Sequence, residues 1–119
     1  MGLNEMLLER LSRCRQIKII VIGRKSGKEI SVPVWFVLEG TELRLLPVQG
    51  SETQWYKNVR KNPRIRIDAR GEAAEFRAAP VTDSNAVQSV VEKFREKYGA
   101  GDVKKYYSRF DVAVLAKPA

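Results

Sequence analysis

The chain has 119 residues, of which 44% are apolar and 30% charged, and its formal net charge is +8. This composition is typical of a soluble globular protein, and the length suits one domain over residues 1–119. The sequence has no histidine and one cysteine, Cys14. We therefore expect no internal disulfide, no metal site, and no Ser-His-Asp or Cys-His catalysis. No apolar run reaches the roughly 20 residues that span a bilayer, and the N-terminus is no secretory signal, so we expect a cytoplasmic protein.

Residues 3–16 predict an amphipathic helix. Leu7, Leu11 and Cys14 recur near helical spacing, with Glu9 and Arg10 between them. We expect this helix to pack on its own domain rather than on a membrane. The remaining elements, over residues 17–117, are expected to form a barrel.

A cationic hairpin opens that barrel. Residues 17–22 and 30–38 are rich in β-branched and aromatic side chains, which predicts two strands. The sequence between them, GRKSGK, has two glycines that permit positive φ angles. Its side chains suit an anion such as a phosphate: Arg24, Lys25, Ser26 and Lys28. A solvated turn with incidental charge is the alternative interpretation.

The rest of the chain predicts four more strands and two more helices. Strands are expected at 43–48, 64–70, 74–78 and 110–116, with Pro80 ending the third of these. Ser51 and Gln54 fit a capping box for a helix ending at residue 62, and Thr82 or Asp83 is expected to cap a helix reaching residue 98. Residues 99–101 predict a break. Short strands in hairpin connection predict a mainly β (α+β) fold, a six-stranded antiparallel barrel with flanking helices.

Three motifs carry a resemblance to a known family. The GRKSG turn at 23–27, Pro33, and the helix motif WYKNVRKNP at 55–63 resemble the deazaflavin-dependent nitroreductase and quinone-reductase family. The resemblance covers about residues 17–81, and the segment 106–115 fits as well. It implies a split β-barrel similar to the flavin-binding pyridoxamine-phosphate oxidases. It also implies a homodimer that binds coenzyme F-420, which delivers a hydride to a nitro compound, a quinone or an enone.

The same resemblance implies roles for individual residues. The cationic turn would hold the phosphate and glutamyl tail, and the other positions would line the ring site, the phosphate-side loop and the substrate side. No catalytic residue is assigned. The implied cofactor-binding residues are Arg24, Lys25, Ser26 and Lys28 in the turn, Pro33, Val34 and Trp35 at the ring, and Gln49, Gly50 and Trp55 in the loop, with Tyr106 and Tyr107 near the substrate.

Two departures from the family pattern keep alternatives open. Ile30 stands where family members carry an arginine, and the loop before Trp55 is shorter, so FMN is an alternative cofactor. A cofactor carrier without turnover is a second hypothesis, and a nucleic-acid-binding barrel a third. Against the third, acidic residues interleave with the basic ones and the aromatics do not follow one exposed strand. We therefore expect no specific nucleic-acid partner.

Overall fold

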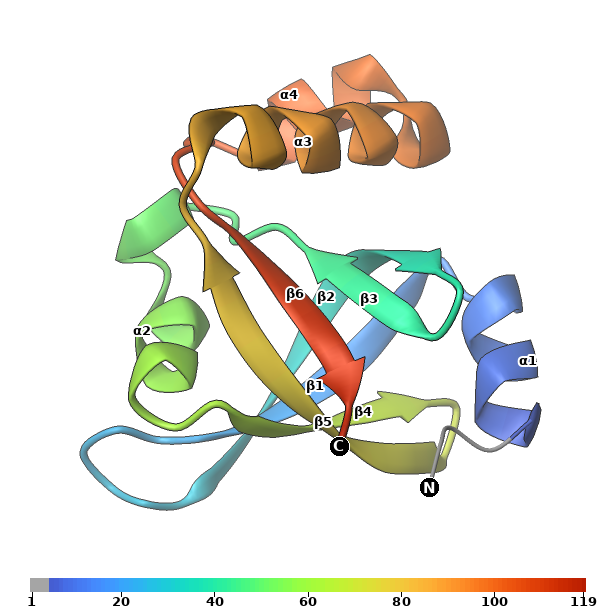
Figure 1. Ribbon diagram of the computed structural model, residues 1–119, viewed down its shortest axis with the longest axis vertical. Helices are drawn as coiled ribbons and strands as arrows, with labels where there is room; N and C mark the ends of the chain where they lie inside the picture. The colour runs from blue at the N-terminus through green and yellow to red at the C-terminus, as the bar shows by residue number, and fades with distance from the viewer. Residues whose placement is uncertain (1–4) are drawn as a thin grey trace.

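The strands close into a barrel. The computed structural model describes residues 5–119, and its strands follow the order β1-β2-β3-β6-β5-β4 around the barrel, each antiparallel to its neighbours (Figure 1). This confirms the predicted six-stranded antiparallel fold with flanking helices. The elements are α1 (Glu5–Arg13), β1 (Gln16–Ile22), β2 (Glu29–Glu39), β3 (Glu42–Leu45), the 3-10 helix η1 (Gly50–Glu52), α2 (Gln54–Lys61), β4 (Arg64–Ala69), β5 (Glu72–Val81), α3 (Ser84–Tyr98), α4 (Ala100–Tyr106) and β6 (Ala113–Pro118).

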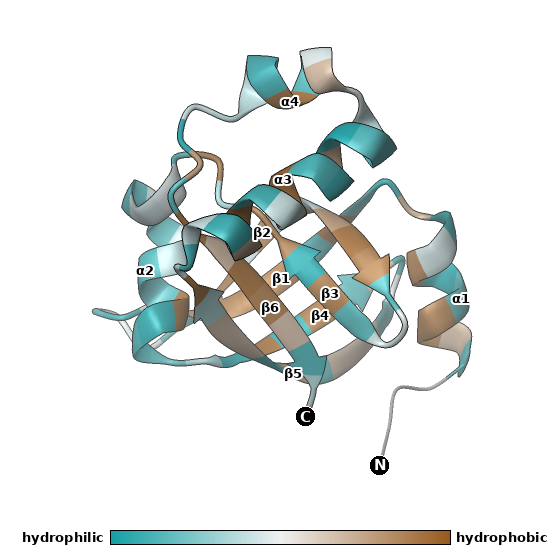
Figure 2. Ribbon diagram, turned by 45° about the horizontal axis from the view of Figure 1, so that its top comes forward, coloured by the Kyte–Doolittle hydropathy of each residue, from teal (hydrophilic) through white to brown (hydrophobic). Residues whose placement is uncertain are grey.

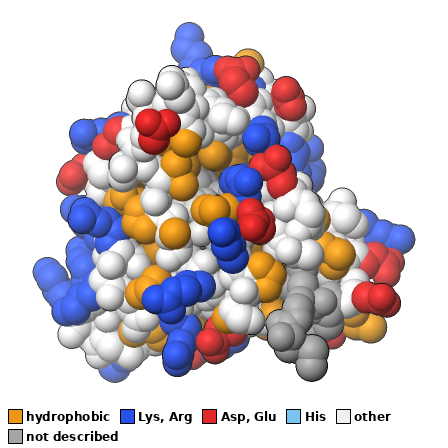
Figure 3. All heavy atoms as spheres, viewed as in Figure 1, with side chains coloured by type: hydrophobic (Ala, Val, Ile, Leu, Met, Phe, Trp, Pro, Cys, Tyr) orange, Lys and Arg blue, Asp and Glu red, His pale blue; other side chains and the backbone are white. Residues whose placement is uncertain are grey.

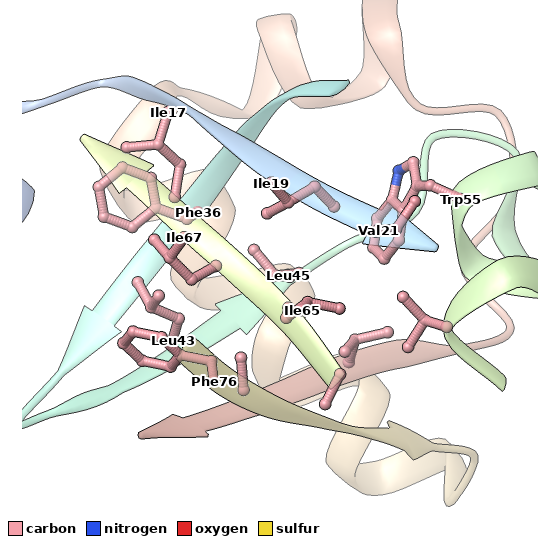
Figure 4. Packing of buried hydrophobic residues seen from close by; sticks show 14 of the residues in the cluster. Ile17, Ile19, Val21, Phe36, Leu43, Leu45, Trp55, Ile65, Ile67 and Phe76 are labelled. Carbon is pink, nitrogen blue, oxygen red and sulfur yellow. The ribbon is translucent and has the colours of Figure 1, made fainter. Parts of the chain in front are cut away.

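The barrel interior is filled by alternate residues of its strands. Ile17, Ile19 and Val21 of β1 are buried, while the residues between them are exposed or half-buried. This period of two arises because successive side chains of a strand point to opposite faces. The side chains that Figure 4 labels meet in the same interior: Phe36, Leu43, Leu45, Trp55, Ile65, Ile67 and Phe76.

A second apolar cluster lies outside the barrel, between its wall and helices α3 and α4 (Figure 2). Trp35 and Val37 of β2 pack into it from the outer face of the sheet. Asp83 caps α3, accepting a hydrogen bond of 2.9 Å from the Ala86 N–H. Of the two predicted caps, Thr82 and Asp83, the structure thus selects Asp83. The predicted apolar stripe of α3 is confirmed and buried: Val87, Val90, Val91, Phe94 and Tyr98.

Helix α1 packs on the barrel, as expected. Leu7 and Leu11 are buried in the barrel cluster, and Cys14 is buried just after the helix. The helix runs over Glu5–Arg13, shorter than the predicted 3–16, and Leu3 lies outside the described residues. Among residues 5–119, no helix is long and apolar enough to cross a membrane.

The structure corrects several local predictions. Ser51 does not cap α2: the N-cap is Thr53, and Ser51 instead bonds Asp111, a partner too distant in sequence for a local rule to find. Pro80 lies within β5, not at its end. The Ala78 N–H still donates to the Pro63 carbonyl oxygen at 2.8 Å, but at Pro80 β5 pairs with β6 only, so no N–H is needed there on the other edge.

The regions after β2 and α3 also differ from expectation. The third strand is shorter than predicted and ends at Leu45, and the last strand is shifted to Ala113–Pro118. A fourth helix, α4, occupies the predicted break. Only Gly99, with φ of 96°, interrupts the helical course. The buried Val103 and Tyr107 anchor the segment in the second cluster, and that tertiary packing outweighs the glycines.

Candidate functional site

A cavity opens along one half of β2. The first part of this strand, 29–35, pairs with β1, whereas pairing with β3 begins only at Phe36. The unpaired edge therefore borders open space instead of another strand. This space is a cavity of about 450 Å³, and its walls are Gln16, Val32, Pro33, Val34, Trp35, Leu46, Val48, Thr53, Trp55, Tyr106 and Tyr107.

Stacked aromatic rings fix one wall of the cavity. The Trp35 indole stacks on the Tyr98 ring with centroids 4.2 Å apart and planes 8° apart. Tyr106 meets the same indole edge-on at 5.6 Å, and the Tyr107 ring lies 6.0 Å away. Trp35 is thus held between rings on two helices and the segment after them, which keeps this wall rigid.

The Tyr98 hydroxyl joins the start of β1 to the middle of β2. It accepts a hydrogen bond of 3.1 Å from the Phe36 N–H, and it lies 2.6 Å from the Arg15 carbonyl oxygen, to which it can donate. Burial raises the pKa of Tyr98 to about 12. Burial, and then the neighbouring Tyr98, also raise the pKa of Tyr107 well above its ordinary value. Both phenols therefore remain protonated at neutral pH and can serve as hydrogen-bond donors.

The opposite rim is the loop between β3 and α2. Asp111 holds it by accepting from the Ser51 N–H at 3.0 Å and from the Ser51 hydroxyl at 2.5 Å. Burial acts to raise the pKa of Asp111, but these bonds and Arg109 lower it overall. Gly50 has φ of 57°, and a Cβ there would lie 2.0 Å from Asp111 Oδ1. The rim thus requires glycine at this position for both its backbone angle and its close contact.

The cationic hairpin tip forms a separate hollow. It has a volume of about 390 Å³ and is lined by Ile22, Gly23, Arg24, Lys25, Ser26, Gly27, Lys61 and Asn62. Only Gly27 of its two glycines uses a positive φ, 70°. Gly23 is needed for space, because a Cβ there would lie 2.6 Å from Ser26 Oγ. In Figure 3 some of the basic side chains lie on the side where Figure 1 shows the tip and α2, and others are spread over the rest of the face.

Arg24 does not project freely from this tip. Its backbone N–H and its Nη1 donate to Asn58 Oδ1 at 3.1 and 2.8 Å, and its Nη2 donates to Gln54 Oε1 at 2.8 Å. Asn58 is only 6% exposed, so its carbonyl oxygen depends on these donors. The arginine therefore clamps the hairpin to α2, and the exposed cations of the tip are Lys25 and Lys28.

The sequence-predicted residues fall into three groups. The cavity brings together Pro33, Val34, Trp35, Trp55, Tyr106 and Tyr107. Arg24, Lys25 and Ser26 line the tip hollow, and the Ser26 hydroxyl accepts from the Lys28 N–H at 3.2 Å. Gln49 and Gly50 lie in the rim loop but do not line the cavity.

Sequence reasoning missed the residues that support the site. Asn58, Tyr98 and Asp111 hold the tip, the aromatic wall and the rim respectively. The sequence does contain a pattern that points to Asn58: its amide lies one helical turn from Trp55, on the predicted buried face of an amphipathic helix. Asp111 had none, since its partner lies 60 positions away.

The fold is an antiparallel barrel with an aromatic cavity at an open strand edge, and solved structures of similar fold include an F420-H2 dependent reductase and a putative pyridoxamine 5'-phosphate oxidase. Residues 7–113 match the family described as "Uncharacterized protein conserved in bacteria (DUF2255)", and the chain belongs to that family. No curated protein matches the chain.

Three solved structures illustrate the shared fold. The heme storage protein HutZ from Vibrio cholerae is 16% identical with a TM-score of 0.72, over 100% of this chain and 92% of that one. The F420-H2 dependent reductase FDR-A is 18% identical with a TM-score of 0.67, over 87% and 94%. A putative pyridoxamine 5'-phosphate oxidase from Listeria innocua is 13% identical with a TM-score of 0.69, over 95% and 90%. At such identities the likeness shows the fold alone.

Proposed function

We propose that this protein binds a flavin-type cofactor, coenzyme F-420 in the first place, and acts as an oxidoreductase on a small organic acceptor. The observation that carries the proposal is the placement of two complementary surfaces along one helix. The aromatic cavity lies at the start of α2, where Trp55 is one of its walls, and the cationic hollow reaches Lys61 at its end. Along α2, Trp55 and Lys61 are separated by about 9 Å of helix.

The cavity suits a planar heteroaromatic ring. Its volume of about 450 Å³ falls within the roughly 300–1,000 Å³ of small-molecule sites, and its lining is mainly apolar. Trp35 and Tyr106 offer ring faces and edges. The unpaired edge of β2 offers backbone groups from every second residue, which can pair with the amide edge of such a ring.

The hairpin tip suits the anionic part of the same cofactor. Lys25 and Lys28 are exposed, and Lys61 Nζ donates to the Arg24 carbonyl at 3.1 Å from the side of α2. Arg24 already donates from both terminal nitrogens. We therefore assign the phosphate contacts to the lysines and to the Ser26 hydroxyl, and a clamping role to Arg24.

The lining residues leave the redox chemistry to the cofactor. None of the cavity's walls is acidic or basic, and the chain has no histidine. A bound deazaflavin would supply the hydride, while the protein provides orientation and excludes water. Tyr106, which is 51% exposed, stands at the mouth, where the acceptor would enter. The lack of histidine also removes the imidazole that commonly ligates haem iron, which favours a flavin-type cofactor.

Parallel titrations test this proposal. Purified protein is dialysed against F-420 and against FMN, and retained cofactor is measured by absorbance. Retention of F-420 is expected, followed by oxidation of reduced F-420 on addition of a nitro compound, a quinone or an enone. Binding without oxidation of reduced cofactor by any of the three acceptors would support a carrier. Retention of neither cofactor at about 100 µM would refute the proposal.

Ile30 offers a sharper test of the cofactor pose. Its side chain is 40% exposed, and it borders the tip, since a Cβ on Gly23 would lie 3.2 Å from Ile30 Cδ1. An arginine here would remain in solvent and reach the anion held by the tip. We expect Ile30→Arg to tighten F-420 binding about tenfold, with the gain shrinking as salt rises. Unchanged affinity at low salt would place the anion elsewhere.

We also propose a homodimer formed through the outer face of β1 and its neighbours. Ile20 and Ile22 are half-buried there without a covering helix. Charges of both signs surround them, including Lys18 opposite Asp68 and the Glu29–Arg66 pair. Such a face can complement a second copy of itself. Light scattering should give twice 13.5 kDa, and Ile20→Lys should shift it toward the monomer. A monomer for the unaltered chain at tens of micromolar would contradict the dimer.

A further inference from the structure

Lys97, in the last turn of α3, lies against the barrel wall instead of in solvent. Its Nζ donates to the Phe36 carbonyl oxygen at 2.8 Å and stands 3.7 Å above the centroid of the Phe36 ring. It is also 5.1 Å from the centroid of the Tyr98 ring. The residue as a whole is half-buried, and its amine lies beside the two rings.

The charges around this amine are unbalanced. The Arg15 guanidinium carbon lies 5.1 Å from the centroid of the same Tyr98 ring, so two cations lie near one aromatic ring. Among residues 5–119, no carboxylate oxygen lies within 4.0 Å of Lys97 Nζ, so Lys97 forms no ion pair there. The carboxylate of Glu39 on β2 is held by Arg44 at 3.1 Å and by Lys93 at 3.5 Å.

Burial and the Arg15 charge oppose the charged form of this amine, and they outweigh the Phe36 carbonyl and ring contacts, which support it. Burial first, and the positive charge of Arg15 second, lower the pKa of Lys97 to about 8, with Cys14 acting weakly in the opposite direction. At pH 7.5 about a quarter of such amines are unprotonated, against about 0.1% for an ordinary lysine. Lys93, one turn earlier in α3, has the Glu39 carboxylate that Lys97 lacks, and it provides a matched comparison.

We propose that Lys97 is a nucleophilic amine and a site of covalent modification by small activated acyl groups, of the acyl phosphate class. The lone pair on Nζ attacks the acyl carbonyl carbon, and the carbon–oxygen bond to phosphate breaks. Inorganic phosphate leaves with the bonding electrons, and the nitrogen loses a proton to water. The amide formed keeps one N–H for the Phe36 carbonyl and removes a charge beside Arg15. Lysines with depressed basicity serve as nucleophiles for the same physical reason in other proteins.

Acetyl phosphate is the probe. The intact protein is incubated with it at pH 7.5, and acetylation of each lysine is followed by peptide mass spectrometry. Because a less basic amine is also a weaker nucleophile, the expected advantage of Lys97 over Lys93 is at least about tenfold, less than the ratio of neutral fractions. The rate at Lys97 should level off above about pH 8.

Arg15→Gln separates this chemistry from mere exposure. The variant keeps the backbone carbonyl that Tyr98 contacts but removes the second cation. Acetylation of Lys97 at pH 7.5 should slow and its pH midpoint should rise, while Lys93 is unchanged. Equal rates at the two lysines in the unaltered protein would overturn the proposal, as would a Lys97 rate that still rises above pH 9. Both results are measured on the unaltered protein, so the proposal can be refuted even if the Arg15→Gln variant does not fold.

Discussion

Two hairpins of the same barrel have basic tips, but their conformations are fixed in different ways. Between β4 and β5 the turn is only Arg70 and Gly71, with φ of 54° and 89°, and Asp68 Oδ1 accepts from the Gly71 N–H at 2.9 Å. These two backbone angles and this bond are local to the hairpin, and one distant side chain joins it to α1: Arg10 Nη1 donates to the Arg70 carbonyl oxygen at 2.6 Å. Between β1 and β2 the six residues 23–28 are fixed by α2, through hydrogen bonds that span 34 positions of sequence.

The difference shows what the longer tip contributes to the site. The β4–β5 turn accepts one long-range bond, from α1, whereas the β1–β2 tip and α2 hold each other through several hydrogen bonds. Arg24 contacts Gln54, and the next residue, Trp55, is a wall of the cavity. Hairpin tip and cavity therefore form one unit, which a cofactor with a ring and a charged tail requires.

Removing the Asn58 side chain should break this unit and produce the largest effect. Asn58→Ala leaves the backbone N–H and Nη1 of Arg24 without their acceptor. The variant loses a hydrogen bond to a charged group and leaves a part-buried N–H without a partner. We therefore expect the free energy of unfolding to fall by about 2–3 kcal/mol. Urea denaturation measures it. Asn62→Ala is the control, since Asn62 Oδ1 accepts only from the Arg64 N–H, at 3.2 Å; equal losses would show that the tip does not depend on α2.

The tip's cations should separate into two kinds. The Lys25→Ala, Lys28→Ala double variant should keep its stability but lose F-420 affinity, by about ten- to a hundredfold for each charge-assisted contact. Arg24→Ala should instead lower stability, because its guanidinium holds Gln54 and Asn58. Isothermal titration and urea denaturation on both proteins give the comparison. The assignment fails if Lys104→Ala, which removes one positive charge on α4, weakens binding as much as each of the two tip changes made singly.

The same contrast explains what could be predicted from sequence. The barrel was predictable because the alternation in β1 and β4 and the turn residues at 70–71 are local signals. Most of the cavity wall was also identified, through a motif resemblance. Arg24 was predicted to hold the cofactor, and a sequence does not show that its guanidinium also bonds Asn58 and Gln54. Ser51 was taken as a helix cap for the same reason, since its competing partner, Asp111, becomes a neighbour only in the folded chain.

Glycine substitutions should show that the short turn is the more constrained of the two. Gly71→Ala places a side chain at φ of 89° between two paired strands and should cost about 1–2 kcal/mol. Gly27→Ala, at φ of 70° with nothing within 4 Å of the added Cβ, should cost less because a longer loop can adjust. Gly101→Ala in α4 is the control and should stabilise by about 0.5–1 kcal/mol. Thermal melts measure all three, and a larger loss at Gly27 would reverse the comparison.

The ion pair that joins the two hairpins should have the smallest effect, and that effect should depend on pH. Glu29, the first residue after the β1–β2 tip, accepts from Arg66 of β4 through both oxygens, at 3.0 and 3.2 Å. The hydrogen bonds from Arg66, and then its charge, hold the pKa of Glu29 below its ordinary value of 4.5. Because the folded carboxyl binds protons less readily than the unfolded one, the pair contributes stability above about pH 4.5. This contribution is lost as the pH falls through the folded pKa.

Glu29→Gln tests this sign directly. Both residues of the pair are solvent-exposed, so only a slight lowering of the urea midpoint is expected at pH 7. The difference from the unaltered protein should vanish as the pH falls well below 4.5, where Glu29 is neutral in both states, and salt should reduce it at pH 7. Glu72→Gln in the β4–β5 hairpin removes a carboxylate that has no ion pair among residues 5–119, and its midpoint should not show this dependence. A Glu29→Gln deficit that persists at low pH would mean that Glu29 acts through packing, and that the two hairpins are joined by the barrel ladder alone.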